Sequence, residues 1–352
     1  MDIRERAGVV DVFCGAGGMT HGFVKEKFRV IAGIDSDGSC SYAFKENNGA
    51  QFIQRDISQI NVYEILKLYA DIEIKILVGC APCQPFSKYT NRKTEDKKWN
   101  LLYDFGRLIE KIEPDIVSME NVPELAKRKK YPVYDDFVNL LERNGYFVSA
   151  NLVYCPDYGI PQTRTRLVLL ASRRGKIDLI PKTHTSRDYK TVRQTIAHLE
   201  PIKDGEVNAT DPLHRTSRLS ELNRKRIRST PEGGGWRDWD ESLMCDCHKK
   251  ASGKNYVAIY GRMSWDDQSP TITTQCTGYG NGRFGHPEQD RAISLREAAL
   301  LQTFPVDYDF IDPNLKTSAG AIARHIGNAV PVQLGAIIAR SIRKHMEEHY
   351  AR

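Results

Sequence analysis

The chain has 352 residues, of which 40% are hydrophobic and 27% are charged, and its formal net charge is +6. This composition excludes an intrinsically disordered protein, a collagen-like repeat and a coiled coil. No apolar run approaches the roughly 18 residues of a membrane-spanning helix, and residues 1–8 lack the apolar core of a secretion signal. We therefore expect a soluble, cytoplasmic protein without a membrane partner, long enough for two domains or for one domain with a large insertion.

The first half of the chain alternates short apolar runs with helical patterns. Strands are predicted at residues 9–13, 30–34, 74–78, 115–119, 147–154 and 167–171, and helices at 101–112 and 134–144. This alternation predicts an α/β fold with a mostly parallel sheet that is covered on both faces. Ligands of such sheets bind beyond the carboxyl ends of the strands. We therefore expect residues 14–18, Asp35, Cys83 and Glu120, which follow predicted strands, around one crevice.

After about Lys182 the regular periodicity fades, and glycine-rich turns alternate with aromatic residues. This pattern predicts a second, irregular domain. Order returns at residues 294–301, where Ser294 is a candidate N-cap and Glu297 follows three residues later. A last helix is predicted after Pro331.

A basic run lies in this second region. Residues 215–228 hold six basic side chains against one acid, Glu221. Such a run can contact phosphates, and it can equally be the solvated face of a helix. The residues alone leave both interpretations open.

The eight cysteines are scattered and show no disulfide framework, so we expect reduced thiols. Cys245, Cys247 and His248 lie close together, and Cys276 follows. Zinc sites usually show paired spacings such as C-x2-C, and this C-x-C-H sequence has no second pair. The sequence therefore predicts no metal site.

A glycine-rich turn, D-V-F-C-G-A-G-G at residues 11–18, follows the first predicted strand. Glycines there let the backbone approach a ligand closely, but the G-x-G-G spacing is not the G-x-G-x-x-G of a diphosphate cradle. Asp35 is placed to accept hydrogen bonds from ribose hydroxyls, and Asp56 from an adenine amino group. These residues suggest a nucleoside cofactor without a diphosphate; the alternative is a structural turn with two surface acids.

Three further positions carry chemistry. Cys83 lies beside Pro82 at a strand end, where a thiolate can act as a nucleophile, whereas most cysteines are inert core residues. Glu120 suits acid–base work or a hydrogen bond to a ring nitrogen, provided that burial raises its pKa. Arg164 and Arg166 are two residues apart in an extended segment, so we expect their side chains to point the same way. Their two guanidinium groups could then bind carbonyl or phosphate oxygens.

Six motifs in order give the chain its resemblance to a known family. They are DVFCGAGG, APCQPFS, ENV, QTRTR, SLREAALLQTFP and GNAVPVQLG, and the match as a whole runs from Val10 to Gly335. In this order and spacing the chain resembles the DNA (cytosine-5)-methyltransferases. The resemblance implies a Rossmann-like, S-adenosyl-L-methionine-dependent sheet domain at residues 1–182 plus 324–352. It also implies a smaller target-recognition domain at 183–290 and a hinge segment at 291–323.

The resemblance implies roles for individual residues. Cys83 would be the nucleophile, and Glu120, Arg166 and the neighbouring Arg164 would complete the catalytic set. The implied cofactor contacts are Phe13, Cys14, Gly15, Gly17, Gly18, Asp35, Asp56, Ile57, Pro82, Leu101, Asn328 and Val330. The family usually carries glutamate where this chain has Asp35, which keeps the carboxylate on a side chain one methylene shorter.

The implied substrate is double-stranded DNA, from which the target cytosine is flipped out. The implied DNA contacts are Gln84, Ser87, Lys88, Arg237, Arg262, Thr271 and Arg283. In this light the basic run 215–228 is interpreted as phosphate contact. We expect a monomer associated with a prokaryotic nucleoid, functionally paired with a restriction endonuclease that it does not contact.

Two alternatives remain from the sequence. A tRNA cytosine-5-methyltransferase would share the catalytic set, but the Cys-Phe-Thr tripeptide of that branch is absent. A catalytically silent DNA-binding paralogue is the other alternative, and the intact Cys83, Glu120 and Arg166 argue against it.

Overall fold

The computed structural model describes residues 2–82, 100–127, 132–250, 253, 255–315 and 317–351. The chain divides into two compact units. Unit 1 consists of Met1–Tyr158, Thr165–Thr183 and Val330–Arg352, and unit 2 of Gly159–Arg164 and His184–Ala329. The assignment of catalytic, target-recognition and hinge roles to parts of the chain stays a prediction.

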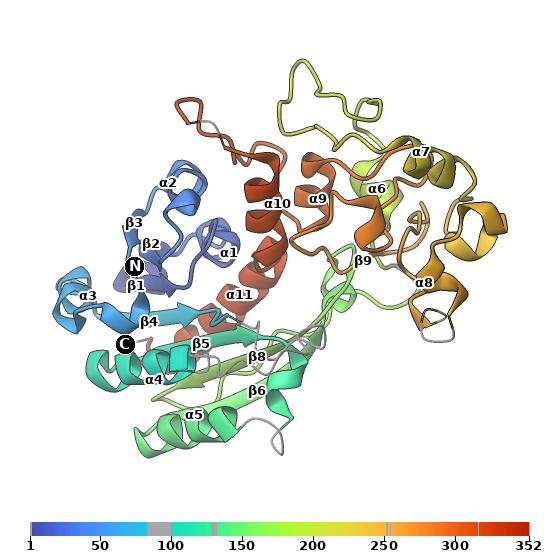
Figure 1. Cartoon of the computed structure of the whole chain (residues 1–352). Coiled ribbons are helices and arrows are strands. Elements are labelled where there is room, and N and C mark those ends of the chain that lie inside the picture. Colours follow the sequence, from blue (N-terminus) through green and yellow to red (C-terminus); the bar gives the residue numbers. More distant parts are fainter. Residues whose placement is uncertain are drawn as a thin grey trace. The chain divides into compact units, whose positions relative to one another are not determined.

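Unit 1 contains a seven-stranded sheet with the strand order β3-β2-β1-β4-β5-β8-β6 (Figure 1). Its strands are β1 (Ala7–Val12), β2 (Arg29–Asp35), β3 (Gln51–Gln54), β4 (Ile74–Gly79), β5 (Ile116–Asn121), β6 (Phe147–Tyr154) and β8 (Thr165–Ser172). The first five strands run parallel, and β8 is antiparallel to both β5 and β6. The predicted α/β class with a mostly parallel sheet is confirmed.

Two details of the sheet differ from the predictions. β3 was not predicted, because glutamines occupy both ends of this four-residue strand and interrupt the apolar pattern. β5 continues to Asn121 instead of ending at Met119, because it stays paired with β8 to that point. Glu120 is therefore a strand residue whose neighbour across the ladder is Val168.

In the part of unit 1 that the structure describes, six helices accompany the sheet. They are α1 (Gly18–Lys25), α2 (Ser41–Asn48), α3 (Val62–Leu68), α4 (Asn100–Ile112), α5 (Pro132–Arg143) and α11 (Val332–His349). One apolar core joins α3, α4 and α5 to the sheet, with Phe105 and Phe137 stacked at 5.7 Å between ring centroids. The predicted helices at 101–112 and 134–144 correspond to α4 and α5, and α11 follows Pro331 as expected.

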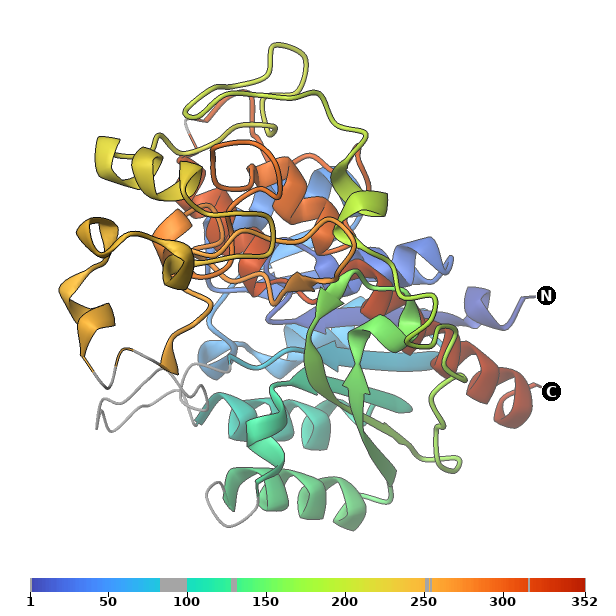
Figure 2. The same cartoon turned by 90° about the vertical axis from the view of Figure 1, so that its right-hand side faces the viewer.

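Helices α1 and α11 pack closely although they are far apart in the sequence (Figure 1). A Cβ atom on Gly22 would collide with the backbone of Gly335 and Ala336, so this contact requires glycine. The two ends of the chain also lie close together (Figures 1 and 2). There, Arg6 Nη1 donates a hydrogen bond of 2.8 Å to the carbonyl oxygen of Tyr350.

Unit 2 is built from short strands and helices joined by long loops. The strands and helices are β7 (Gln162–Thr163), β9 (Ser269–Pro270), α6 (Val192–Ile196), α7 (Glu221–Arg228), α8 (Asp246–Lys249), α9 (Leu295–Leu301) and α10 (Ala319–Asn328). The N-terminus of α9 carries the predicted capping box between Ser294 and Glu297. Among the helices that the structure describes, none combines the length and apolarity needed to cross a membrane.

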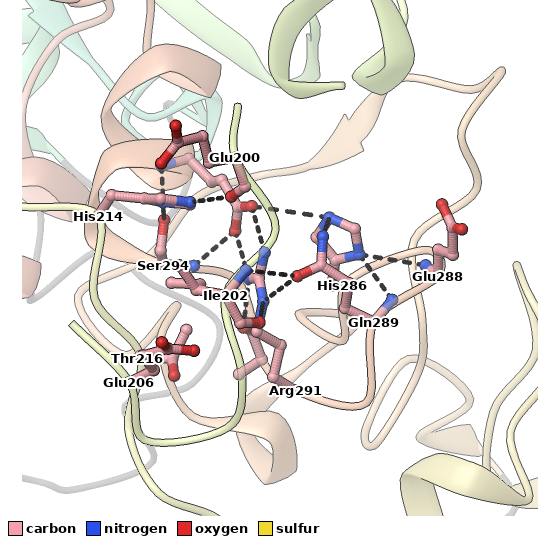
Figure 3. A network of polar contacts seen from close by, with 12 residues as sticks. Glu200, Ile202, Glu206, His214, Thr216, His286, Glu288, Gln289, Arg291 and Ser294 are labelled. Carbon is pink, nitrogen blue, oxygen red and sulfur yellow. Dashed lines mark hydrogen bonds and ion pairs between the residues drawn. The ribbon is translucent and has the colours of Figure 1, made fainter. Parts of the chain in front are cut away.

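A buried polar network holds the loops before α9 (Figure 3). The Arg291 guanidinium donates hydrogen bonds of 2.8 and 2.7 Å to the two carboxylate oxygens of Glu297, and both side chains are 1% exposed. The Ser294 amide donates to the same carboxylate at 2.7 Å, and Arg291 Nε donates to the carbonyl oxygen of Ile202 at 3.1 Å. The network therefore ties the start of α9 to a loop about ninety residues earlier in the chain.

Two titratable groups of this network, Glu297 and His286, have lowered pKa values. Burial alone would raise the pKa of Glu297, but the hydrogen bonds and charge of Arg291 outweigh it and lower the pKa to about 2. Burial lowers the pKa of His286 to about 4. The amides of Glu288 and Gln289 donate to His286 Nδ1 at 3.1 and 2.9 Å, which keeps this nitrogen unprotonated and the ring neutral.

We predict that the free energy of unfolding decreases as the pH is lowered. The unfolded chain protonates His286 below about pH 6.5 and Glu297 below about pH 4.5, while the folded chain holds these groups unprotonated down to about pH 4 and pH 2. Glu297→Gln leaves the buried Arg291 charge without its partner and should destabilise by about 3–5 kcal/mol at pH 7. Urea unfolding at a series of pH values measures both effects.

The matched control is Glu288→Gln, which changes an exposed glutamate two residues from His286. It should leave stability at pH 7 within about 0.5 kcal/mol of the parent. If Glu297→Gln and the parent lose stability equally between pH 4.5 and pH 2, the Arg291–Glu297 pair is not the source of that part of the acid sensitivity.

Candidate active site

A carboxyl group and a guanidinium group are paired at the end of β5. Arg166 Nε on β8 lies 3.0 Å from Glu120 Oε1, with the side chains 13% and 8% exposed. Arg166 Nη1 also donates to the carbonyl oxygen of Thr165 at 2.8 Å, which restricts the guanidinium. The antiparallel register of β5 and β8 makes the two residues diagonal neighbours. The pair is thus held by the sheet itself rather than by a loop.

Asn121, the residue after Glu120, fixes the segment that follows β4. Its Nδ2 donates to the carbonyl oxygen of Ala81 at 3.1 Å, and its Oδ1 accepts from the Val122 amide at 2.9 Å. Ala81 is two residues before Cys83, the predicted nucleophile. The sequence prediction omitted Asn121, although its place beside Glu120 in the ENV motif was a usable signal.

Four predicted residues lie outside the part of the chain that the structure describes. They are Cys83, Gln84, Ser87 and Lys88. Their predicted roles are therefore neither supported nor contradicted by the geometry.

Cys80 lies near enough to Glu120 to feel its charge and is a poor nucleophile. Burial raises the pKa of its thiol well above the usual range, and the negative charge of Glu120 raises it further. A thiol that stays protonated at neutral pH attacks slowly. Cys80 therefore has the properties of an inert thiol rather than of a nucleophile.

The glycine-rich turn between β1 and α1 has a left-handed backbone at three positions. The φ angles are 61° at Phe13, 52° at Gly15 and 90° at Gly17. Thr20 Oγ1 donates a hydrogen bond of 2.6 Å to Asp11 Oδ2, which joins the end of β1 to the first turn of α1. The turn is therefore held at both ends, and a Cβ on Gly15 would meet no atom within 4 Å.

Asp35, at the end of β2, receives two backbone hydrogen bonds. The Gly15 amide donates to Oδ2 and the Asp37 amide donates to Oδ1, each at 2.9 Å. Burial raises the pKa of Asp35, while these two amides act in the opposite direction. Each carboxylate oxygen has a second lone pair, which a hydroxyl group of a ligand can use.

Asp11 is a buried acid that the sequence prediction did not assign. Burial raises its pKa to about 7, and Oδ1 has no hydrogen-bond partner among the described residues. An acid inside the apolar run V-V-D-V-F was the signal in the sequence.

Asp56 and Ile57 lie in a short turn next to α4. Asp56 Oδ1 accepts a hydrogen bond of 2.9 Å from the Ser58 amide, and Ile57 is 3% exposed. Arg107 Nη2 on α4 donates to the carbonyl oxygen of Ile57 at 3.0 Å. The turn is therefore fixed to the same helix that carries Leu101.

The remaining residues that the sequence predicts to bind the cofactor differ in burial and in the unit to which they belong. Cys14 is buried and its amide donates to Ile34 O at 3.2 Å, and Gly18 opens α1. Pro82 and Leu101 are half-buried, Val330 is buried in unit 1, and Asn328 is the exposed last residue of α10 in unit 2.

Arg164 does not share the surroundings of Arg166. It belongs to unit 2, is 4% exposed, and donates to Gln162 Oε1, Ile272 O and Ala329 O at 3.3–3.4 Å. These contacts therefore do not show the guanidinium groups of Arg164 and Arg166 directed at a common ligand, as the sequence predicts. These contacts hold Arg164 within unit 2, and its place in the catalytic set stays a prediction.

The prediction that Arg262 reads DNA bases conflicts with its environment. The residue is 4% exposed, and its Nε donates to the carbonyl oxygen of Thr230 at 2.7 Å. The two terminal nitrogens donate to Ile227 O, His286 O and Gln289 O and to the Asp290 carboxylate. All five N–H groups of the guanidinium are engaged, so none is left for a base edge.

Three other residues that the sequence predicts to bind DNA differ in how far other groups of the protein engage their side chains. Thr271 Oγ1 donates to the carbonyl oxygen of Thr163 at 3.0 Å, and the half-buried Arg283 donates to Gly234 O at 2.7 Å. Arg237 is exposed, with its guanidinium 5.7 Å from the centre of the Trp236 ring.

The basic run falls on α7 and the loop before it. Arg226 is buried, donates to Leu243 O at 2.9 Å and lies over the rings of Trp239 and Tyr260, so it is a packing residue. The exposed members of the run are Arg218, Lys225 and Arg228. The interpretation as phosphate contact is thus restricted to the exposed part of the run.

Comparison with known proteins identifies the family. The chain is 54% identical over 339 residues to the type II methylase M.HgiDII of Herpetosiphon aurantiacus, a match that covers 96% of each chain. It is 30% identical to the type II methyltransferase M.PspPI of a Psychrobacter strain, over 95% of this chain and 78% of that protein. The fold is similar to that of a putative DNA modification methyltransferase from an E. coli prophage, with a TM-score of 0.75, 20% identity and coverage of 97% and 99%. Residues 7–344 match the model of the C-5 cytosine-specific DNA methylases, so the chain belongs to this family.

Proposed function

We propose that the protein transfers a methyl group from S-adenosyl-L-methionine to C5 of a flipped-out cytosine in a specific duplex DNA site, through a covalent bond between Cys83 and C6. The observation that carries this proposal is the Glu120–Arg166 pair, held at the end of β5 beside the segment that leads to Cys83. The relatives named type II methylases support a role beside a restriction endonuclease.

The residue types suit the cytosine chemistry. C5 of cytosine is a poor nucleophile, and addition of the Cys83 thiolate to C6 makes C5 enamine-like. Glu120 would hydrogen-bond or protonate N3 as the thiolate adds, and Arg166 would bind O2 and stabilise the same developing negative charge. After methyl transfer a base removes the C5 proton, the C6–S bond breaks and Cys83 is regenerated. The target carbon is inaccessible in a duplex, so the base must leave the stack.

The turn at residues 13–18 and its neighbours fit the proposed cofactor. The cofactor supplies a methyl group on a sulfonium when bound. Asp35 has lone pairs left for ribose hydroxyls, and a Cβ on Gly15 would meet no described atom within 4 Å. Asp56 would bind the adenine edge.

Replacing Asp35 should weaken cofactor binding. Asp35→Asn removes the charge and one acceptor, and hydrogen bonds to charged groups contribute about 1.5–3 kcal/mol. We expect the Kd of S-adenosyl-L-methionine, measured by calorimetry, to rise about 10–100-fold. Asp35→Glu keeps the carboxylate and should keep most of the affinity, and Asp71→Asn, at an exposed position, is the matched control. An unchanged Kd in Asp35→Asn would remove Asp35 from the site.

We further propose that unit 2 recognises the DNA site. Arg237 and the exposed basic residues Lys225 and Arg228 support this assignment, because exposed cations can contact phosphates. The proposal includes a monomer bound to duplex DNA, with no contact to the paired endonuclease and a place at the nucleoid.

Bisulfite sequencing of DNA from cells that express the protein tests the proposed function. We expect one short sequence to be protected at a fixed cytosine, and no such protection with Cys83→Ala. Incubation with labelled S-adenosyl-L-methionine and either duplex DNA or tRNA separates the two substrate classes. Label in tRNA alone would overturn the proposal in favour of an RNA methyltransferase.

A further inference from the structure

Two cysteines and a histidine of unit 2 converge at the four-residue helix α8. Figure 1 labels this helix. One ligand atom of each of Cys245, Cys247 and His248 lies within 4.8 Å of the other two. Cys245 precedes the helix, and its carbonyl oxygen accepts a hydrogen bond of 2.9 Å from the His248 amide. The backbone of this single turn therefore brings the three side chains together. The spacing of the residues in the sequence does not predict such a cluster.

His248 has a buried nitrogen, Nδ1, that no described residue satisfies. The residue is 4% exposed, and Nδ1 has no hydrogen-bond partner among the described residues. The imidazole stacks on Trp236 with 4.3 Å between ring centroids, so it cannot easily turn to water. A buried polar atom without a partner costs about 1–3 kcal/mol. A nitrogen in this state keeps its lone pair for a metal ion.

We propose that Cys245, Cys247 and His248 bind one Zn²⁺ ion, His248 through Nδ1. Two thiolates and one neutral imidazole are donors that zinc favours, and with them the charge of the site is zero. The two thiols would release their protons to solvent as the metal–sulfur bonds form. Three protein ligands leave a fourth position for water, and the exposed Cys247 gives the ion a path from solvent.

The surroundings agree with a neutral metal–thiolate site. The guanidinium of Arg226 lies 5.1 Å from the centre of the Tyr260 ring, and Tyr260 packs against His248 at 5.9 Å between ring centroids. The positive charge of Arg226 would oppose a metal ion held by neutral ligands alone, so the proposed site requires both thiolates.

The ion would fasten a weakly held segment to the core of unit 2. A helix of four residues is not stable by itself. His248 is the one residue of α8 that is buried, and it packs on the aromatic cluster that contains Trp236 and Trp239. Coordination by the adjacent cysteines would hold the start of the helix on the same cluster. The inferred role is therefore structural, separate from methyl transfer.

Metal content and cobalt spectroscopy test the proposal on the full, untagged chain under reducing conditions. We expect about one zinc per chain by mass spectrometry of the metal, and Co²⁺ substitution should give a thiolate-to-cobalt charge-transfer band with the d–d bands of a tetrahedral site. Cys245→Ser with Cys247→Ser should abolish the charge-transfer band, and His248→Gln should weaken metal binding at least about 10-fold.

Two controls separate this cluster from other thiols. Cys276→Ala removes a buried cysteine of the same unit, and Cys83→Ala removes the proposed nucleophile; both should keep the parent cobalt spectrum. Chelation should lower the Tm of the parent and leave that of the double serine variant unchanged. Absence of zinc and of a cobalt–thiolate band in the folded parent would overturn the proposal, as would an unchanged band in the double serine variant.

Discussion

Cys83→Ala should reduce methyl transfer to duplex DNA by at least about 10⁴-fold and leave cofactor binding almost unchanged. The proposed reaction depends on a sulfur–carbon bond that activates the cytosine ring, and alanine has no atom that can form it. DNA with 5-fluorocytosine at the target position should become covalently attached to the parent protein in the presence of cofactor, because fluorine blocks the removal of the C5 substituent. Gel analysis and peptide mapping locate the attachment.

Cys80→Ala is the matched control for this experiment. It removes a thiol three residues away whose pKa is raised by burial, so covalent capture should persist. Capture that survives in Cys83→Ala would assign the nucleophile to another residue. A parent protein that binds DNA and cofactor but never forms the adduct would favour the silent DNA-binding paralogue.

Glu120→Gln should lower kcat by about 10²–10³-fold, with a smaller effect on the KM for DNA. Glutamine has nearly the same shape, but it cannot give a proton to N3 and carries no charge to pair with Arg166. The loss should therefore appear in the chemical step rather than in DNA binding. Single-turnover measurements of methyl transfer separate the two.

The pairing of Glu120 with Arg166 makes a further prediction for the double variant. Arg166→Lys removes the fork that would bind O2, and the two substitutions together should cost less than the sum of their separate effects. Glu110→Gln on α4, at an exposed position, should leave kcat unchanged. Strict additivity of Glu120→Gln and Arg166→Lys would mean that the two residues act independently in the reaction.

The central strands could be predicted because burial on both faces makes them continuous apolar runs. β3 could not, since a short edge strand flanked by Gln51 and Gln54 lacks that pattern. The end of β5 was placed too early for a related reason. Glu120 and Asn121 look like the start of a loop, and only the pairing with β8 shows that they are strand residues.

The candidate site shows the same limit for side chains. Arg262 is predicted to bind DNA because glycines and aromatic residues surround it in the sequence. The carbonyl groups that accept its hydrogen bonds belong to Ile227, Thr230 and His286, which lie 24 to 35 residues away in the sequence. Contacts at such separation are invisible to local patterns. The spacing of the C-x-C-H sequence around Cys245 does not predict a metal site. In the structure a single helical turn nevertheless brings Cys245, Cys247 and His248 together.

The packing of α11 on α1 has a consequence for how the protein is made. Gly335 and Ala336, which cover Gly22, are translated about 310 residues after it. Until then the side of α1 that faces α11 has no cover, although β2 and α2 already contact the helix. A chain that is cut short before α11 would therefore leave this side of α1 unprotected, however complete its sheet.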